Sequence, residues 1–212
     1  NDSDSAAVKV LKRIGRLFTS LYIWVFRGTP MMVQSLIFYY AIFNLFKRTG
    51  MSVTEINRVW SLFISGLVTV SLNSTAYLAE VLRGGILAVD AGQMEAARSL
   101  GMTHWQAMRR VVFPQAIKNS LPAIGNEFII NIKDSSVLCV LGVSDLMFMT
   151  RSVAGIYYKG TECYLIAATV YLFLTYLSSL LLKAITGRMT APDNTKRRQG
   201  NQTVDLGLPS SN

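Results

Sequence analysis

The chain has 212 residues, of which 51% are hydrophobic and only 16% are charged, with a mean hydropathy of +0.35. Ordinary soluble domains carry roughly a quarter charged residues, so this composition favours a membrane protein. The net charge of +9 does not indicate nucleic-acid binding, because the basic residues lie between long apolar runs rather than on one polar surface.

The first expected element is an amphipathic helix over residues 8–27. Its apolar residues recur at helical spacing, and its basic residues lie largely on the opposite face: Lys9, Lys12, Arg13 and Arg16. This pattern predicts an interfacial elbow helix that rests among lipid headgroups and leads the chain into the bilayer. The alternative is the end of a further helix of a longer chain, because the sequence does not begin with Met.

Three runs without charged residues approach or reach the roughly 20 residues that a transmembrane helix needs. They cover residues 31–46, 59–79 and 164–182. A fourth apolar run, 121–143, contains Glu127, Lys133 and Asp134. Together these runs predict an all-α, polytopic transmembrane helical bundle of about four to five spans.

The distribution of Lys and Arg predicts the orientation of the bundle, since cytoplasmic loops retain basic residues. With four spans, fifteen basic residues lie in segments 1–30, 83–118 and 183–212, and five lie in segments 47–58 and 144–163. Both ends of the chain and the loop 83–118 are therefore expected on the cytoplasmic side.

The loop 83–118 is too patterned to be a simple connector, and it predicts two short helices. Asp90 with Gln93 resembles an N-cap and N3 pair, and Gly101 is placed to end that helix in the left-handed conformation. Thr103 with Gln106 forms a second capping pair, followed by Trp105, and Pro114 is expected to stop or kink the second helix. Such a compact knob is suited to docking in a groove of another protein.

The same loop resembles the EAA loop of bacterial ABC importer permeases, whose pattern is EAA-x3-G-x9-I-x-L-P. Here Glu95-Ala96-Ala97 is followed at the matching spacing by Gly101, Val111 and Phe113-Pro114, with Val for Ile and Phe for Leu. Further segments resemble the polar amino acid branch of that family: Phe26-Arg27-Gly28-Thr29-Pro30, Tyr77 with Ala79-Glu80, Arg83-Gly84-Gly85-Ile86, Gly92-Gln93, Pro114-Gln115-Ala116 and Lys133-Asp134-Ser135-Ser136.

The resemblance implies a type I ABC importer permease in a bacterial cytoplasmic membrane. It implies ABC ATPase subunits, a second permease copy or paralogue, and a solute-binding protein or domain as partners, with a polar amino acid as substrate. The ATPase-coupling residues carried over from the EAA loop and its flank are Glu95, Ala96, Ala97, Gly101, Trp105 and Pro114. Members of the family usually carry one more transmembrane helix at the N-terminus.

A search for catalytic and metal motifs finds none in the sequence. There is no GxxxxGK[ST] phosphate loop, His104 is the single histidine, and Cys139 and Cys163 lack metal-site spacing. We therefore expect no metal, no cofactor and no enzymatic activity, with ATP hydrolysis assigned to a partner subunit.

Polar residues within the apolar runs indicate a substrate path, because ionisable groups in a bilayer must face protein or water. Glu127 and Asn131 share a helical face with Asp134, and Asn126 lies beside Glu127. Asn73 and Tyr77, one turn apart, are expected to face the same cavity as Glu127 and to bind the solute. The alternative for Asn73 is helix packing.

Two further groups are expected to have structural roles. Lys133 and Asp134 are expected to neutralise charged partners on neighbouring helices or to cap a broken helix, with substrate contact as the alternative. Glu80 and Arg83 are expected to form an interfacial ion pair or a gate contact at the membrane exit rather than bind substrate.

Two other function classes are compatible with part of the pattern. A channel or secondary transporter would use the polar spans but not the double-helix loop, and a membrane scaffold would use the loop but not the buried charges. The expected organisation is one permease domain over residues 1–188 and a disordered tail over 189–212.

Overall fold

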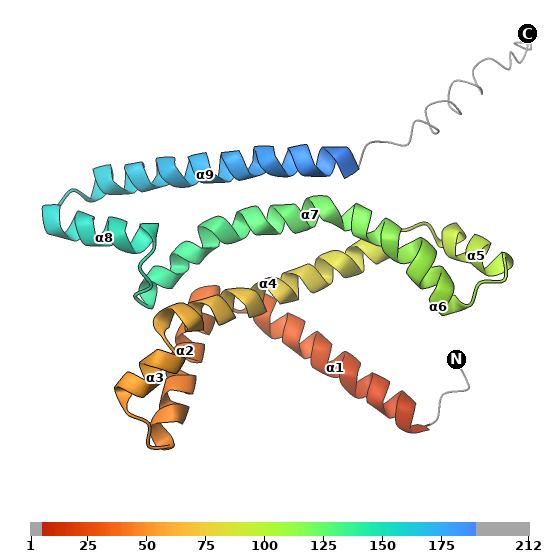
Figure 1. Cartoon of the computed structure of the whole chain (residues 1–212), viewed down its shortest axis with the longest axis horizontal. Helices are drawn as coiled ribbons and strands as arrows, with labels where there is room; N and C mark the ends of the chain where they lie inside the picture. The colour runs from red at the N-terminus through yellow and green to blue at the C-terminus, as the bar shows by residue number, and fades with distance from the viewer. Residues whose placement is uncertain (1–5, 190–212) are drawn as a thin grey trace, which may run out of the picture.

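The computed structural model describes residues 6–189, and within that range the chain is helical without strands (Figure 1). The elements are α1 (Ala6–Gly28), α2 (Met31–Arg48), α3 (Val53–Val59), α4 (Leu62–Leu87), α5 (Ala91–Ser99), α6 (His104–Ala107), the π-helical segment η1 (Met108–Val112), α7 (Phe113–Asp134), the 3-10 segment η2 (Ser135–Val140), α8 (Leu146–Tyr157) and α9 (Gly160–Met189). The expected all-α class is confirmed. The expected tail lies outside the described residues except for Met189, which ends α9.

The centre of the molecule is the pairing of α4 with α7, and α9 packs on the other side of α7 (Figure 1). Small residues line the buried face of α4, among them Ser65, Thr69 and Gly85. A Cβ on Gly85 would overlap the Ser120 hydroxyl and the Ala116 carbonyl of α7. Small side chains therefore allow the two backbones to approach closely, as is usual between membrane helices.

The membrane crossings differ from those expected. By length and apolar composition, α4 and α9 can each span a membrane, and α1 with α2 can form one further crossing that is broken and bent by 112°. The run 31–46 can therefore cross the membrane only together with α1. The fourth run is also shifted, because α7 begins at Phe113 and ends at Asp134 instead of covering 121–143.

The two ends of the molecule are distinct. In Figure 1, α5, α6, the start of α1 and the end of α9 lie toward one end, whereas α3 and α8 lie at the other. The helix expected over 8–27 is present within α1, and its apolar side chains are exposed, including Leu11, Phe18 and Trp24. Its interfacial position remains a prediction.

Candidate coupling and solute sites

The segment from Asp90 to Val112, here called the protrusion, contains two short helices joined at Gly101. Gly101 has φ +81°, the left-handed conformation that glycine adopts at low cost. Its N–H donates to the carbonyl of Arg98 at 3.0 Å, and the Met102 N–H donates to the carbonyl of Ala97 at 3.2 Å. This bonding pattern is a Schellman motif, so the expected glycine ending of the first helix is confirmed.

The caps of the two helices differ in detail from the expectation. Thr103 and Gln106 form a full capping box, with the Thr103 N–H donating to Gln106 Oε1 at 2.9 Å. Asp90 also caps its helix, but it accepts from the Gly92 N–H at 2.6 Å. Gln93 does not complete a box there, because its Oε1 accepts from Gln115 of α7 at 3.3 Å. That bond ties the protrusion to the base of α7.

The protrusion has a small buried interior and an apolar outer surface. Ala97, Ala107 and Val112 are buried between α5, α6 and η1. In contrast, Leu100 is 80% exposed and Trp105 is 70% exposed. The other EAA residues, Glu95 and Ala96, are also exposed. Exposed apolar side chains on a rigid support are typical of an anchor for a protein partner.

Pro114 does not stop the second helix, so that half of the expectation is wrong, but the regular α-helical pattern is interrupted directly before it. The chain stays helical from His104 to Asp134, and the change occurs in the π-helical turn Met108–Val112. Pro114 follows that turn at the start of α7, so its missing N–H donor falls where the regular α-helical bonding is already interrupted. The protrusion is thus joined to α7 by continuous helical backbone.

The break between α1 and α2 is held by two amide side chains. Gln34 of α2 donates to the carbonyls of Phe26 at 2.9 Å and Thr29 at 3.0 Å. Asn73 of α4 donates to the Phe26 carbonyl at 3.1 Å and to Gln34 Oε1 at 3.0 Å. Both N–H groups of Asn73 are therefore used within the fold, which is the packing role left open for it by the sequence. The bonds satisfy carbonyls that the helix break exposes.

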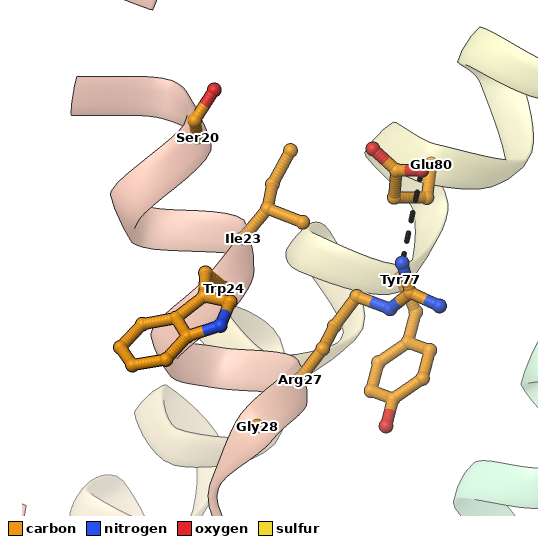
Figure 2. Close-up of a pocket in the computed structure, with 7 residues that line it drawn as sticks. All are labelled: Ser20, Ile23, Trp24, Arg27, Gly28, Tyr77 and Glu80. Atoms are coloured by element: carbon orange, nitrogen blue, oxygen red, sulfur yellow. Dashed lines mark ion pairs between the residues drawn. The ribbon is translucent and has the colours of Figure 1, made fainter. Parts of the chain in front are cut away.

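A cavity of about 510 Å³ lies beside this break, between α1 and α4, and we call it the α1–α4 cavity. Figure 2 shows Trp24 and Arg27 of α1 on one side and Tyr77 and Glu80 of α4 on the other. The Arg27 guanidinium lies 5.2 Å from the centre of the Tyr77 ring, and its Nη1 is 3.7 Å from Glu80 Oε2. Two charges of opposite sign thus face one cavity.

Glu80 is held more tightly by its other partner. Arg83 donates to both carboxylate oxygens of Glu80, with its Nη2 2.7 Å from Oε2. The expected pair of Glu80 and Arg83 is therefore confirmed. Glu80 also belongs to the cavity wall, which the sequence analysis did not anticipate.

The predicted polar face of α7 is placed apart from this cavity wall. Asn131 donates to the Ser74 hydroxyl of α4 at 2.8 Å, which links the two helices. Glu127 is half-buried and Asn126 is exposed, and neither has a hydrogen-bond partner among residues 8–187. The structure therefore does not bring Glu127 into the lining that contains Tyr77, although the Arg27 charge acts on it.

Lys133 and Asp134 lie where α7 gives way to η2, so the helix is broken at that point. Both side chains are exposed, and in the described part of the chain neither makes an ion pair. Neutralisation of a neighbouring helix within this chain is thus not observed. No role was predicted for Arg27 or Gln34 from the sequence, although Arg27 lies in the segment Phe26-Arg27-Gly28-Thr29-Pro30.

Comparison with known proteins gives consistent matches over most of the chain. The family model described as "Binding-protein-dependent transport system inner membrane component" matches residues 5–191. The putative glutamine transport system permease protein GlnP of Rickettsia conorii is 39% identical over 87% of this chain and 80% of that protein. The probable amino-acid permease protein YxeN of Bacillus subtilis is 38% identical, over 84% and 75%.

A solved structure agrees with these sequence matches. It is described as the crystal structure of an amino acid ABC transporter with histidines, and it matches with a TM-score of 0.70 and 45% sequence identity. The match covers 81% of this chain and 75% of that chain. Sequence and structure comparisons thus identify the same kind of protein.

Proposed function

The chain belongs to the family of inner membrane components of binding-protein-dependent transport systems, and we propose that it forms the path by which an ABC importer moves polar amino acids. The observation that carries this proposal is the rigid protrusion, whose exposed Leu100 and Trp105 stand on a buried interior. The names of the relatives, which include glutamine and amino-acid permeases, support the substrate class. Residues 1–188 act as one permease domain.

The protrusion docks on an ABC ATPase subunit, which hydrolyses the ATP that drives transport. Glu95, Ala96 and Trp105 lie on its outside, whereas Ala97 and Gly101 maintain its shape. Movement of the ATPase reaches the membrane helices by two routes, because α4 leads directly into α5 and the continuous helix through Pro114 leads into α7. Since α4 and α7 are packed together at Gly85, they move as a unit.

The orientation follows from the same docking. The protrusion faces the cytoplasm, and the start of α1 and the end of α9 lie toward the same end of the molecule (Figure 1). The opposite end, with α3 and α8, faces the solute-binding protein or domain. A second copy or a paralogue covers apolar surface that this chain leaves exposed, including Leu172 and Phe173 of α9.

The substrate path follows the face of α4 that carries the α1–α4 cavity and continues to the polar residues of α7. Tyr77 lines the α1–α4 cavity, and Glu127 with Asn126 provides polar groups on the adjoining helix. Asn73 and Asn131 fix the helices around the path through their hydrogen bonds.

Reconstitution of the complex into proteoliposomes tests the proposal. The permease is purified with its ATPase subunit, and uptake of radiolabelled L-glutamine is measured with its solute-binding protein on the opposite side from ATP. We expect uptake that requires ATP, the ATPase and the binding protein. Uptake by the permease without an ATPase would refute the proposal.

A further inference from the structure

We propose that the α1–α4 cavity is a clamp for the zwitterionic backbone of a free α-amino acid, in which Arg27 binds the carboxylate and Glu80 binds the ammonium group. This inference rests on the proposed function and adds to it the atoms that recognise the substrate class. The two charged groups lie on opposite walls of one cavity, as Figure 2 shows.

The size and openness of the space suit a small solute. A cavity of about 510 Å³ lies within the usual range for small-molecule sites. The Trp24 side chain forms one wall and is 74% exposed, and Gly28 leaves space beside Arg27, with no atom within 4 Å of where a Cβ would stand. A solute can therefore reach the charged groups.

The distances in the two ion pairs indicate which charged group is free to bind a solute. Arg27 is 3.7 Å from Glu80, whereas Arg83 holds the same carboxylate at 2.7 Å. Arg27 is thus the loosely held partner, and its guanidinium is supported from below by the Tyr77 ring. A planar guanidinium can bind a carboxylate through two parallel hydrogen bonds, which would be stronger than the long contact that it now makes.

The site carries two positive groups, Arg27 and Arg83, and one negative group, Glu80, so a zwitterion is the solute that can offer an opposite charge to both walls. An anion at Arg27 would be repelled by Glu80, and a cation at Glu80 would be repelled by Arg27 and Arg83. A zwitterion aligned with the pair places its carboxylate at Arg27 and its ammonium group at Glu80, and it leaves the net charge of the site unchanged. The clamp contacts only the backbone groups of the amino acid, so it would accept different side chains.

The clamp is held in place by the α1–α2 break. Arg27 is next to Phe26, whose carbonyl accepts from both Gln34 and Asn73. These two amides fix the end of α1 against α4 and thereby set the distance between Arg27 and Glu80. Asn73 is thus a positioning residue for the clamp.

Direct binding to the permease–ATPase complex in nanodiscs tests the clamp without the selectivity of the binding protein. The probes are radiolabelled L-glutamine and L-histidine, each competed with its α-amide, which lacks the carboxylate charge, and its deamino analogue, which lacks the ammonium group. We expect the unmodified complex to reject both analogues by at least about tenfold, because each analogue lacks one of the two ionic contacts that the amino acid makes.

Three variants test which charged residue binds the carboxylate and which binds the ammonium group. Arg27→Gln should lose at least about tenfold in amino acid affinity and should no longer discriminate against the α-amide. Glu80→Gln should instead lose discrimination against the deamino analogue. Arg27→Lys keeps the positive charge but lacks the two parallel N–H donors of a guanidinium group, so its affinity for the amino acid should be intermediate. Arg58→Gln, at an exposed arginine of α3 that makes no ion pair within the described part of the chain, is the matched control and should bind normally.

The outcomes separate the clamp from the proposed function. If the complex imports L-glutamine with ATP but Arg27→Gln and Arg27→Lys keep normal discrimination, the clamp is wrong and the proposed function stands. Phosphatidylethanolamine carries the same two charges in its headgroup, so binding is repeated in nanodiscs with and without this lipid. Loss of amino acid binding in its presence would assign the cavity to lipid and overturn the clamp.

Discussion

The protrusion and the α1–α4 cavity are built in opposite ways. The protrusion is one continuous segment whose caps and glycine turn bond to residues a few positions away. The cavity combines α1 with α4, and the break beside it is held by bonds between residues 47 and 39 positions apart. A segment held by short-range bonds can be altered without disturbing the rest of the fold, whereas the cavity depends on how the helices pack.

Gly85 lies between these two regions on α4, and its substitution should have the largest effect because it disturbs both. An added methyl group in Gly85→Ala would overlap Ser120 and Ala116 of α7. We expect a loss of about 1–3 kcal/mol of stability, seen as a lower unfolding temperature of the purified complex together with weaker ATPase association and weaker amino acid binding. Gly84→Ala is the control, since among the described residues no atom beyond its chain neighbours and its own helical turn lies within 4 Å of its Cβ position. Equal stability of the two variants would contradict the close packing.

Gly101→Val should distinguish the role of the protrusion from that of the cavity, because it strains only the protrusion. Gly101 and Gly50 have φ values of +81° and +87°, and both positions are open, so valine costs about 1–3 kcal/mol of local strain at either site. We expect Gly101→Val to reduce co-purification with the ATPase and stimulated ATP hydrolysis by at least about tenfold. Amino acid binding to the membrane domain should persist.

Gly50→Val supplies the same strain at the α2–α3 turn, far from the protrusion (Figure 1). It should leave ATPase association intact. If both valine variants lose the ATPase equally, general destabilisation and not the shape of the protrusion would explain the result.

The contrast also explains how much could be predicted from the sequence. The Schellman turn at Gly101 and the capping box at Thr103 follow from short-range chemistry, and both were predicted correctly. The role of Gln93 was not, because its partner Gln115 belongs to the next long helix. The start of α7 was also misplaced, since helices continue through polar residues such as Lys118 when packing supports them.

The cavity could not have been assembled from the sequence alone. Asn73 and Tyr77 were correctly identified as polar positions on one helix, but their neighbours depend on the bend of 112° between α1 and α2. The end of α1 at that bend carries the Phe26 carbonyl that accepts from Asn73, and it carries Arg27, which lies over Tyr77. Helical periodicity indicates which residues share a face, but it does not indicate which helix that face meets.

Asn73→Ala should affect the cavity and spare the protrusion, which is the reverse of Gly101→Val. Loss of its two hydrogen bonds leaves the Gln34 oxygen without a donor and should cost about 1–2 kcal/mol. We expect several-fold weaker binding of L-glutamine with unchanged ATPase co-purification. Ser71→Ala is the control, because the exposed Ser71 hydroxyl bonds only within its own helix. Unchanged glutamine affinity in Asn73→Ala would mean that the break does not position the site.

The two capping boxes should give smaller effects. Thr103→Ala in the protrusion and Ser52→Ala at the start of α3 each remove one N-cap, at a cost of about 1 kcal/mol. Hydrogen exchange should show faster opening of α6 in the first variant and of α3 in the second. Only Thr103→Ala should weaken ATPase association. If Ser52→Ala weakens it as strongly, the effect cannot be assigned to the protrusion.

The same two caps should differ in their response to acid, which is the smallest effect expected. The Ser52 hydroxyl and backbone N–H donate to Glu55, and these bonds lower the pKa of Glu55 from its ordinary value of 4.5. The stabilisation is therefore complete above 4.5 and is lost as the pH falls through the lower pKa of the folded state. Gln106 does not titrate, so the α6 cap should be insensitive. Pulse-labelled hydrogen exchange at pH 7 and at about pH 3 should show protection declining in α3 relative to α6. A parallel decline in both helices would indicate general acid unfolding and no separate contribution from Glu55.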